Sequence, residues 1–236
     1  MGGPDPAARG RELIEVLELA AMFPARRAHA HRADLRPGTC TRARPGGLTG
    51  PSEMARLTGL PRKIVAVHRA LDAAGLAHAF GGALALAWCT ERARGTIDID
   101  VNVFVPAAEA ATVVMALPKG VRATPAQLDA LERDGQVRLF WDSTPVDLFL
   151  DTTEFHVQAA ARARWEDFGG EQLPFLSCAD LAVFKAFFDR TKDWADLEEM
   201  AAVGALDVDR VLGILVRYLG ADDHRVARLA GLAPLA

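Results

Sequence analysis

The sequence lacks a long apolar run, a signal-peptide pattern and an excess of positive charge. No apolar run in its 236 residues reaches the roughly 18 that a membrane-spanning helix needs. The first residues, Met-Gly-Gly-Pro-Asp-Pro, lack a basic stretch followed by an apolar core, so we predict no signal peptide and no membrane partner. The net charge of −4 excludes a strongly basic nucleic-acid-binding composition, although a local basic face is compatible with it.

Cysteine is also scarce. Cys40, Cys89 and Cys178 are far apart, match no metal-binding spacing, and leave an odd thiol under any pairing. A reducing compartment fits this usage best, and we therefore predict a cytoplasmic protein.

The first fifty residues differ in composition from the rest of the chain. Residues 11–22 predict a short helix, whereas residues 26–50 are rich in Arg, Pro, Gly and His and cannot support a packed core. This stretch is either a solvated extension, with the working domain beginning near Met54, or an arginine-bearing segment that contacts RNA. We divide the chain into an N-terminal extension with a flexible linker (1–50), a core (51–176) and a helical C-terminal region (177–236).

From residue 62 onward, helical patterns alternate with short strands. Patterns of apolar residues and of turn or cap residues predict helices over 62–74, 83–90, 107–117, 125–133, 154–164, 178–189, 207–219 and 222–232. A dense charge cluster over 189–200 leads into a further helix. They predict strands over 78–80, 97–105, 136–141 and 145–150, and a short edge segment over 173–176.

Two aspartates lie within the predicted strand over 97–105. Side chains alternate along a strand, so Asp98 and Asp100 face the same side, and two such carboxylates repel unless a cation lies between them. Mg²⁺ is the expected ion, with Mn²⁺ as an alternative. Asp147 lies within another apolar strand and also needs a partner. That partner is either a metal shared with Asp98 and Asp100 or an arginine such as Arg138.

Two further features indicate phosphate binding. Gly81-Gly82 precedes a predicted helix, and exposed amides at a helix start attract phosphate, although Gly-Gly alone is more often a simple turn. Lys185 lies in an apolar helix, which is unusual for a lysine without a partner.

These pieces together resemble the signature of the DNA polymerase β-type nucleotidyltransferase superfamily, and more narrowly of the AbiEii and MenT-like toxins of toxin–antitoxin systems. The resemblance covers about Arg62 to Met200. It rests on Gly81-Gly82-Ala83-Leu84-Ala85, Arg94-Gly95-Thr96-Ile97-Asp98-Ile99-Asp100, Val146-Asp147-Leu148, Asp180-Leu181, Lys185 and Arg190-x-Lys192-Asp193-x-x-Asp196-Leu197. Gly82 stands where many members of the superfamily have Ser, and the spacing from Gly82 to Asp98 is long for the superfamily.

The resemblance implies an α+β fold with a small mixed sheet, helices on one face, and a helical C-terminal region. It implies that Asp98, Asp100 and Asp147 bind the metal and that these three residues and Lys185 are catalytic. The nucleotide-binding residues that it implies are Gly81, Gly82, Arg94, Thr96, Lys185, Arg190, Lys192 and Asp193.

The activity that the resemblance implies is transfer of NMP from an NTP to an acceptor hydroxyl, with release of pyrophosphate. A toxin-like member would act on the 3′ end of tRNA and have a cognate antitoxin. Binding of tRNA would need basic residues, for which the candidates are Arg56, Arg62, Lys63, Arg69, Arg162, Arg164, Arg190 and Lys192. The alternatives are transfer to a protein or small-molecule hydroxyl, or a catalytically silent module that binds a nucleotide or a partner.

Overall fold

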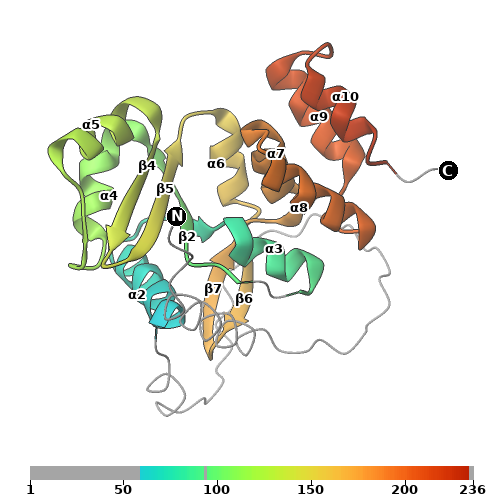
Figure 1. Cartoon of the computed structure of the whole chain (residues 1–236). Helices are drawn as coiled ribbons and strands as arrows, with labels where there is room; N and C mark the ends of the chain where they lie inside the picture. The colour runs from blue at the N-terminus through green and yellow to red at the C-terminus, as the bar shows by residue number, and fades with distance from the viewer. Residues whose placement is uncertain (1–58, 93–94, 234–236) are drawn as a thin grey trace, which may run out of the picture.

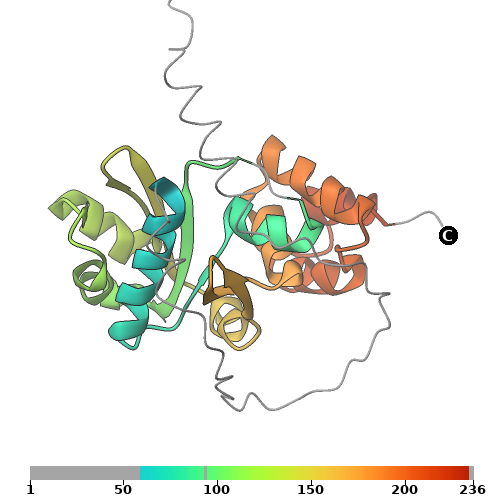
Figure 2. The same cartoon turned by 90° about the horizontal axis from the view of Figure 1, so that it is seen from below.

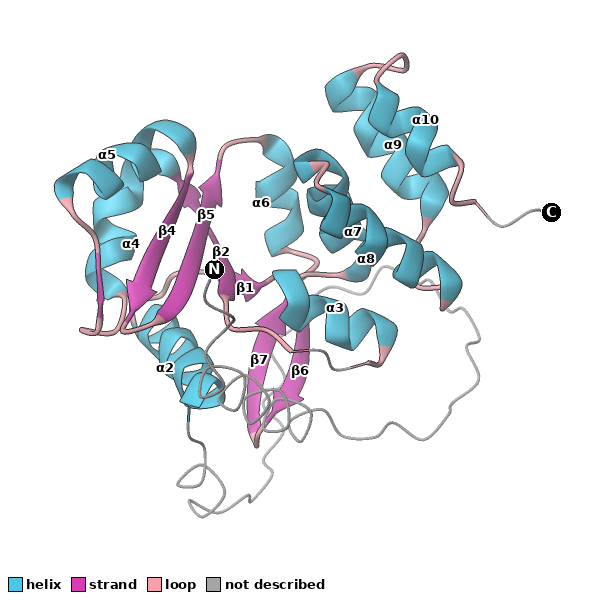
Figure 3. Ribbon diagram, in the orientation of Figure 1, coloured by secondary structure: helices cyan, strands magenta, loops and turns pink. Residues whose placement is uncertain are grey.

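A single mixed β-sheet organises the part of the chain that this computed structural model describes, residues 59–92 and 95–233 (Figures 1 and 3). The strand order is β3-β4-β5-β2-β1-β7-β6. The strands are β1 (His78–Phe80), β2 (Ile99–Pro106), β3 (Val121–Arg122), β4 (Gln136–Trp141), β5 (Thr144–Asp151), β6 (Arg164–Phe168) and β7 (Glu171–Phe175). This sheet, followed by helices, confirms the predicted α+β class.

Helices pack around this sheet and continue beyond it. They are α2 (Gly59–Ala73), α3 (Gly82–Thr90), the 3-10 turn η2 (Ala107–Glu109), α4 (Ala110–Ala116), α5 (Pro125–Asp134), α6 (Glu154–Ala160), α7 (Cys178–Phe188), α8 (Thr191–Ala202), α9 (Val208–Leu219) and α10 (His224–Ala230). Helices α2, α4 and α5 gather on one side of β2, and α3, α7 and α8 lie on its other side (Figures 1 and 2). None of the described helices is long and apolar enough to cross a membrane.

The two faces of the central strands differ because side chains alternate along them. In β2, Ile99, Val101 and Val103 are fully buried in the main core. In β5, the residues on either side of Asp147, Val146 and Leu148, are buried in the same core. The carboxylates therefore share the opposite face, which looks toward α3 and α7.

Strands β2 and β5 are parallel neighbours, and Asp100 is the register partner of Asp147. On its other edge β2 pairs antiparallel with β1, which in turn pairs parallel with β7. The mixed pairing thus aligns two acidic residues that are distant in the sequence.

Two predicted helix starts are confirmed by their caps. The Thr124 hydroxyl accepts a hydrogen bond from the Gln127 amide, and Gln127 reaches back to the Thr124 amide, a complete capping box. The Ser177 hydroxyl likewise accepts from the Asp180 amide at the start of α7.

The prediction for residues 154–176 was partly wrong. The expected helix over 154–164 ends at Ala160, and residues 164–168 form β6, which pairs with β7 in a hairpin closed at Gly169-Gly170. Helix-favouring alanines before residue 164 concealed the strand. The segment expected at the sheet edge, β7, is internal, and β6 is the edge strand.

A disulfide joins Cys89, near the end of α3, to Cys178, at the start of α7. The sequence spacing gave no indication of this pair, because only the packing of α3 beside α7 brings the two residues together. The expectation of reduced thiols is thus not what the structure contains. The predicted features within residues 1–58, including the 11–22 helix, the linker and Cys40, lie outside the described residues, as does Arg94.

Candidate active site

The start of α3 closely approaches the acidic end of β2. The Gly81 amide donates to the Asp100 carbonyl oxygen (2.9 Å), which fixes the turn against the strand. Gly82 has a φ of +52°, and a Cβ on this residue would lie 1.9 Å from Asp100 Oδ2. A side chain at this position would collide with the Asp100 carboxylate, so the close approach of α3 to β2 requires glycine.

Asp98 precedes β2, and Thr96 shapes its backbone. The Asp98 amide donates to Thr96 Oγ1 (3.2 Å), and the Thr96 hydroxyl lies 3.3 Å from the Asp98 carbonyl oxygen. Thr96, Asp98, Asp100 and Asp147 all border one cavity of about 270 Å³, which we call the carboxylate cavity. The structure therefore brings together the three aspartates that the sequence singled out.

Asp147 is held by an arginine. Arg138, on β4, donates to both carboxylate oxygens of Asp147 (Nε–Oδ1 2.7 Å, NH2–Oδ2 2.6 Å) and lies 3.3 Å from Asp98 Oδ2. The two residues are register partners in adjacent strands, which makes the bidentate geometry available. Of the two partners expected for Asp147, the structure contains the arginine.

Asp100 lacks such a cation. Its pKa is raised to about 6, chiefly by burial and then by the charges of Asp147 and Asp98, against the weaker opposing effect of Lys185 and Lys192. A cation placed between these carboxylates would remove the repulsion that raises this pKa.

Lys185 projects from α7 into the same cavity but is already paired. Its Nζ lies 2.5 Å from Asp196 Oδ2 and 3.9 Å from Asp193 Oδ1, and all three side chains are buried. The pairing explains how a lysine is tolerated within an apolar helix. Lys185 is thus placed at the cavity wall, with its charge balanced by α8.

The residues that follow α7 complete the wall. Arg190 forms two hydrogen bonds to the carboxylate of Asp193 (2.6 and 3.1 Å), and its guanidinium lies 4.7 Å from the ring centre of Phe188. Lys192 is exposed, borders the cavity, and lies close enough to Asp100 to affect its pKa. Asp193 therefore positions Arg190, while Lys192 presents its charge to solvent in the cavity.

Sequence reasoning missed two features of this site. Asp196, which neutralises Lys185, was part of the recognised segment but received no role; the two residues lie on different helices, α7 and α8, so only the packing of these helices pairs them. Phe149, two residues beyond Asp147 on the same face of β5, borders the cavity and received no role in the sequence analysis. Strand alternation could have identified it, because it places Phe149 beside Asp147.

The residues at this cavity fit a divalent cation. Carboxylate oxygens are the ligands that Mg²⁺ and Mn²⁺ prefer, and three aspartates border the cavity. The pKa of Asp100 is raised chiefly by burial and in addition by the charges of Asp147 and Asp98, which a cation would offset. No three acidic, histidine or cysteine side chains of residues 59–92 and 95–233 form a ready-made cluster, since Asp147 is turned to Arg138. A metal held by Asp98, Asp100 and Asp147 stays a prediction and requires Arg138 to yield part of its contact.

Comparison with known proteins gives a limited result. No protein-family model matches this chain, and no curated protein is similar to it. Among solved structures, the antibiotic-resistance factor ANT(2″)-Ia is similar over 73% of this chain and 94% of its own, with 15% identity and a TM-score of 0.48. An antigenic nucleotidyltransferase-like protein from Paracoccidioides brasiliensis is similar over 77% of this chain and 88% of its own, with 12% identity and a TM-score of 0.42. At these scores, neither likeness identifies a substrate or a reaction.

Proposed function

We propose that this protein is a metal-dependent nucleotidyltransferase that moves NMP from an NTP to an acceptor hydroxyl and releases pyrophosphate. The observation that carries the proposal is the alignment of Asp100 with Asp147 across β2 and β5, beside Asp98 and directly under the glycine turn of α3. Acidic residues that meet at one cavity, beside amides at a helix start, suit a charged phosphate chain and its cation.

The triphosphate lies at the start of α3. The first amides of a helix have no acceptor within it, so those of Gly82 and Ala83 point toward the cavity mouth and attract anions. Lys192 is exposed at the same cavity and adds a positive charge, and Arg190 adds a second one. Lys185 adds a further positive charge from the α7 wall of the cavity while it remains paired with Asp196.

Asp98, Asp100 and Asp147 would hold the cation, which would supply Lewis acidity toward the α-phosphate and the acceptor hydroxyl. The aspartates keep their negative charge because the cation offsets their mutual repulsion. Arg138 compensates Asp147 in the absence of the cation and remains close to the site of attack. Positioning and electrostatics thus contribute most of the rate, as is general in phosphoryl transfer.

The proposed acceptor is the 3′ end of tRNA, and the proposed biological role is that of a toxin with an antitoxin partner. Support for this finer assignment comes from the resemblance of the motifs between Gly81 and Leu197. Transfer to a protein or small-molecule hydroxyl, or binding without transfer, would each give a different result in the following experiment.

The experiment is label transfer. Purified protein is incubated with total tRNA, Mg²⁺ and each α-labelled NTP in turn, beside Asp100→Asn and the matched control Asp129→Asn, an exposed aspartate on α5. We expect label on tRNA, a loss of at least about a hundredfold in Asp100→Asn, and no change in Asp129→Asn. Label that appears only on protein when lysate replaces tRNA would exclude the tRNA assignment. Label in the small-molecule fraction of the lysate alone would assign a small-molecule acceptor, and no label in any fraction would exclude the transferase.

A further inference from the structure

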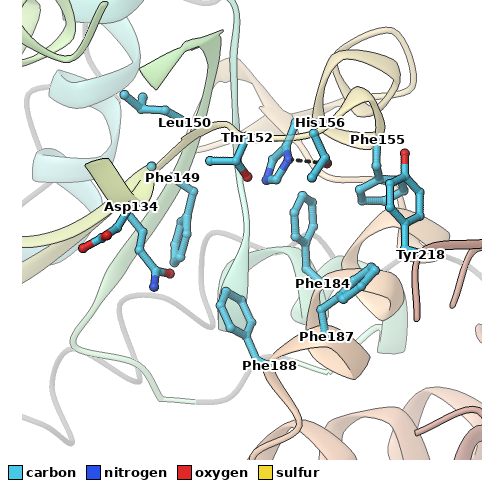
Figure 4. A pocket seen from close by; sticks show the side chains of 13 residues that line it. Asp134, Phe149, Leu150, Thr152, Phe155, His156, Phe184, Phe187, Phe188 and Tyr218 are labelled. Atoms are coloured by element: carbon cyan, nitrogen blue, oxygen red, sulfur yellow. Dashed lines mark hydrogen bonds between the residues drawn. The ribbon is translucent and has the colours of Figure 1, made fainter. Parts of the chain in front are cut away.

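A second pocket, which the proposed chemistry does not use, lies farther along β5. It has a volume of about 260 Å³ and is bordered by the end of β5, the start of α6, α7 and α9. Two pairs of aromatic rings frame it, Phe149 with Phe188 (centres 5.6 Å apart) and His156 with Phe184 (5.0 Å), as Figure 4 shows. Phe187 and Tyr218 close the side toward the C-terminal helices. The volume is below the roughly 300–1,000 Å³ of sites for drug-sized ligands, so one ring system is the appropriate guest.

The chemistry of the lining excludes a charged guest. None of the lysines and arginines in residues 59–92 and 95–233 borders this pocket, so the described lining does not suit a phosphate. Its one acidic residue, Asp134, is engaged by both the Nε and NH2 of Arg133 (2.9 and 2.6 Å), so it offers little attraction to a polycationic sugar. Burial lowers the pKa of His156 to about 4, and its Nδ1 lies 3.0 Å from Thr153 Oγ1, so the imidazole is neutral. An uncharged planar ring fits these walls.

A third cavity, which we call the channel, shares lining residues with both this aromatic pocket and the carboxylate cavity. It has a volume of about 300 Å³, and its lining includes Gln136, Arg138, Asp147, Phe149, Phe188 and Arg190. It shares Asp147, Phe149 and Arg190 with the carboxylate cavity, and Gln136, Phe149 and Phe188 with the aromatic pocket. A molecule that enters from the aromatic pocket therefore reaches Asp147 first.

The direction of the channel indicates which substrate uses it. In phosphoryl transfer, the attacking and leaving oxygens are roughly in line with the phosphorus. Pyrophosphate leaves on the side of Lys192, which borders the carboxylate cavity and neither the aromatic pocket nor the channel. The acceptor hydroxyl must approach from the opposite side, and this is the side of Asp147, Arg138 and the channel.

We propose that the aromatic pocket binds the terminal nucleobase of an unpaired nucleic-acid acceptor and so places its 3′-hydroxyl next to Asp147. This inference rests on the proposed function and names the acceptor class from the site itself. Bases of single-stranded nucleic acids stack on aromatic side chains, and each stacked base contributes roughly 1–3 kcal/mol.

The test is a binding measurement that needs neither NTP nor metal. A fluorescently labelled single-stranded RNA is compared by anisotropy with the same RNA lacking only its 3′-terminal base. We expect the complete RNA to bind the wild-type protein about tenfold more tightly. Phe187→Leu, which keeps apolar volume but removes the ring, should abolish this difference, and Phe187→Tyr should restore it. Phe140→Leu is the matched control, because Phe140 is half-exposed on β4 and borders none of these cavities.

Three outcomes overturn the proposal. The first is equal binding of both RNAs by the wild-type protein, even where label transfer succeeds. The second is an unchanged preference in a folded Phe187→Leu. The third is a loss of NTP affinity in Phe187→Leu with RNA binding intact, which would assign the pocket to the base of the nucleotide. Failure of label transfer with a retained, Phe187-dependent preference would instead reject the chemistry and leave the base pocket in place.

Discussion

Single contacts at the carboxylate cavity set its shape, and the most constrained of them is the approach of Gly82 to Asp100. We predict that Gly82→Ala lowers the transfer rate by about a hundredfold, because the added Cβ displaces the Asp100 carboxylate. Its cost in stability from the positive φ alone is about 1 kcal/mol. Transfer kinetics and urea unfolding measure the two effects.

Gly75→Ala is the matched control. Gly75 also has a positive φ (+71°), but a Cβ there meets no atom within 4 Å. It should therefore show the stability loss without the kinetic one, and equal rates for the two variants would contradict the steric explanation.

Arg138 governs the charge of the same cavity. We predict that Arg138→Gln lowers the free energy of unfolding without metal by about 1 kcal/mol, because Asp147 loses its bidentate partner. Added Mg²⁺ should then raise the melting temperature of this variant more than that of the wild type, since no guanidinium competes for the carboxylates. Thermal unfolding with and without Mg²⁺ measures the difference.

Arg133→Gln serves as its control, since Arg133 makes a similar two-point contact with Asp134 outside the cavity. Its response to Mg²⁺ should equal that of the wild type. An identical Mg²⁺ response in Arg138→Gln would show that the arginine and the metal do not share the aspartates.

At the scale of elements, α2 and β1 are joined by a buried pair of histidines. His68 Nδ1 lies 2.9 Å from His78 Nε2, and His78 Nδ1 lies 2.8 Å from the Leu76 carbonyl oxygen. Burial lowers the pKa of both rings, and the pKa of His78 falls to about 4. The negative charge of Asp72 opposes this shift in both rings. For His68, Glu171 also opposes the shift, whereas the positive charge of Arg69 adds to it. The neutral forms are therefore part of the folded state.

We predict that the contribution of His78 is complete above pH 6.5 and is lost as the pH falls toward 4, because the unfolded chain binds the proton first. The full loss amounts to about 3 kcal/mol. Urea unfolding of wild type and His78→Gln between pH 7.5 and 4 measures it. The comparison between the two proteins is essential, because Asp100 and Asp151, whose pKa values burial raises to about 6, change stability in the opposite direction. Parallel profiles would contradict the prediction.

The elements that were predictable are those with strong local signals. Strands β1 and β4 have the predicted bounds, and Thr124 and Ser177 begin helices as their cap chemistry indicates. Strand β6 was missed because its pairing with β7, and not local propensity, makes it a strand. The Cys89–Cys178 bond was equally inaccessible, since it depends on how α3 packs beside α7.

The site divides in the same way. The sequence was sufficient to bring Asp98, Asp100 and Asp147 together, because alternation and an unpaired acid in an apolar strand are local arguments. It could not assign Lys185 to Asp196 or select Arg138 as the partner of Asp147, because both choices depend on spatial neighbours. These contacts determine which charged side chains of the site have an oppositely charged partner and which do not.

At the scale of the whole molecule, most of the basic residues expected to bind RNA are paired with acids within residues 59–92 and 95–233. Five of the expected RNA-binding residues form ion pairs with acidic side chains. The pairs are Lys63 with Asp142, Arg69 with Glu171, Arg162 with Asp180, Arg164 with Glu166, and Arg190 with Asp193. Arg56 lies outside the described residues. Arg62 and Lys192 are exposed and form no ion pair with the described residues, so the expected residues provide a small unpaired basic surface on that part of the chain.

We predict that RNA affinity depends only weakly on salt. The slope of log K against log salt concentration should be no steeper than about −2, because few phosphates are neutralised. Anisotropy titrations across a range of salt concentrations measure this slope. A slope near −5 would contradict this prediction and indicate a larger phosphate-binding surface.

The register of β2 and β5 also has a consequence for protein synthesis. Parallel neighbours require a crossover connection, and here α4, β3, α5 and β4 must be made and folded before Asp147 can align with Asp100. Lys185 and Lys192 follow later still in the chain. Under the proposed function, a chain still emerging from the ribosome thus contains Asp98 and Asp100 without Asp147, Lys185 and Lys192, and its site stays incomplete until translation has passed α8.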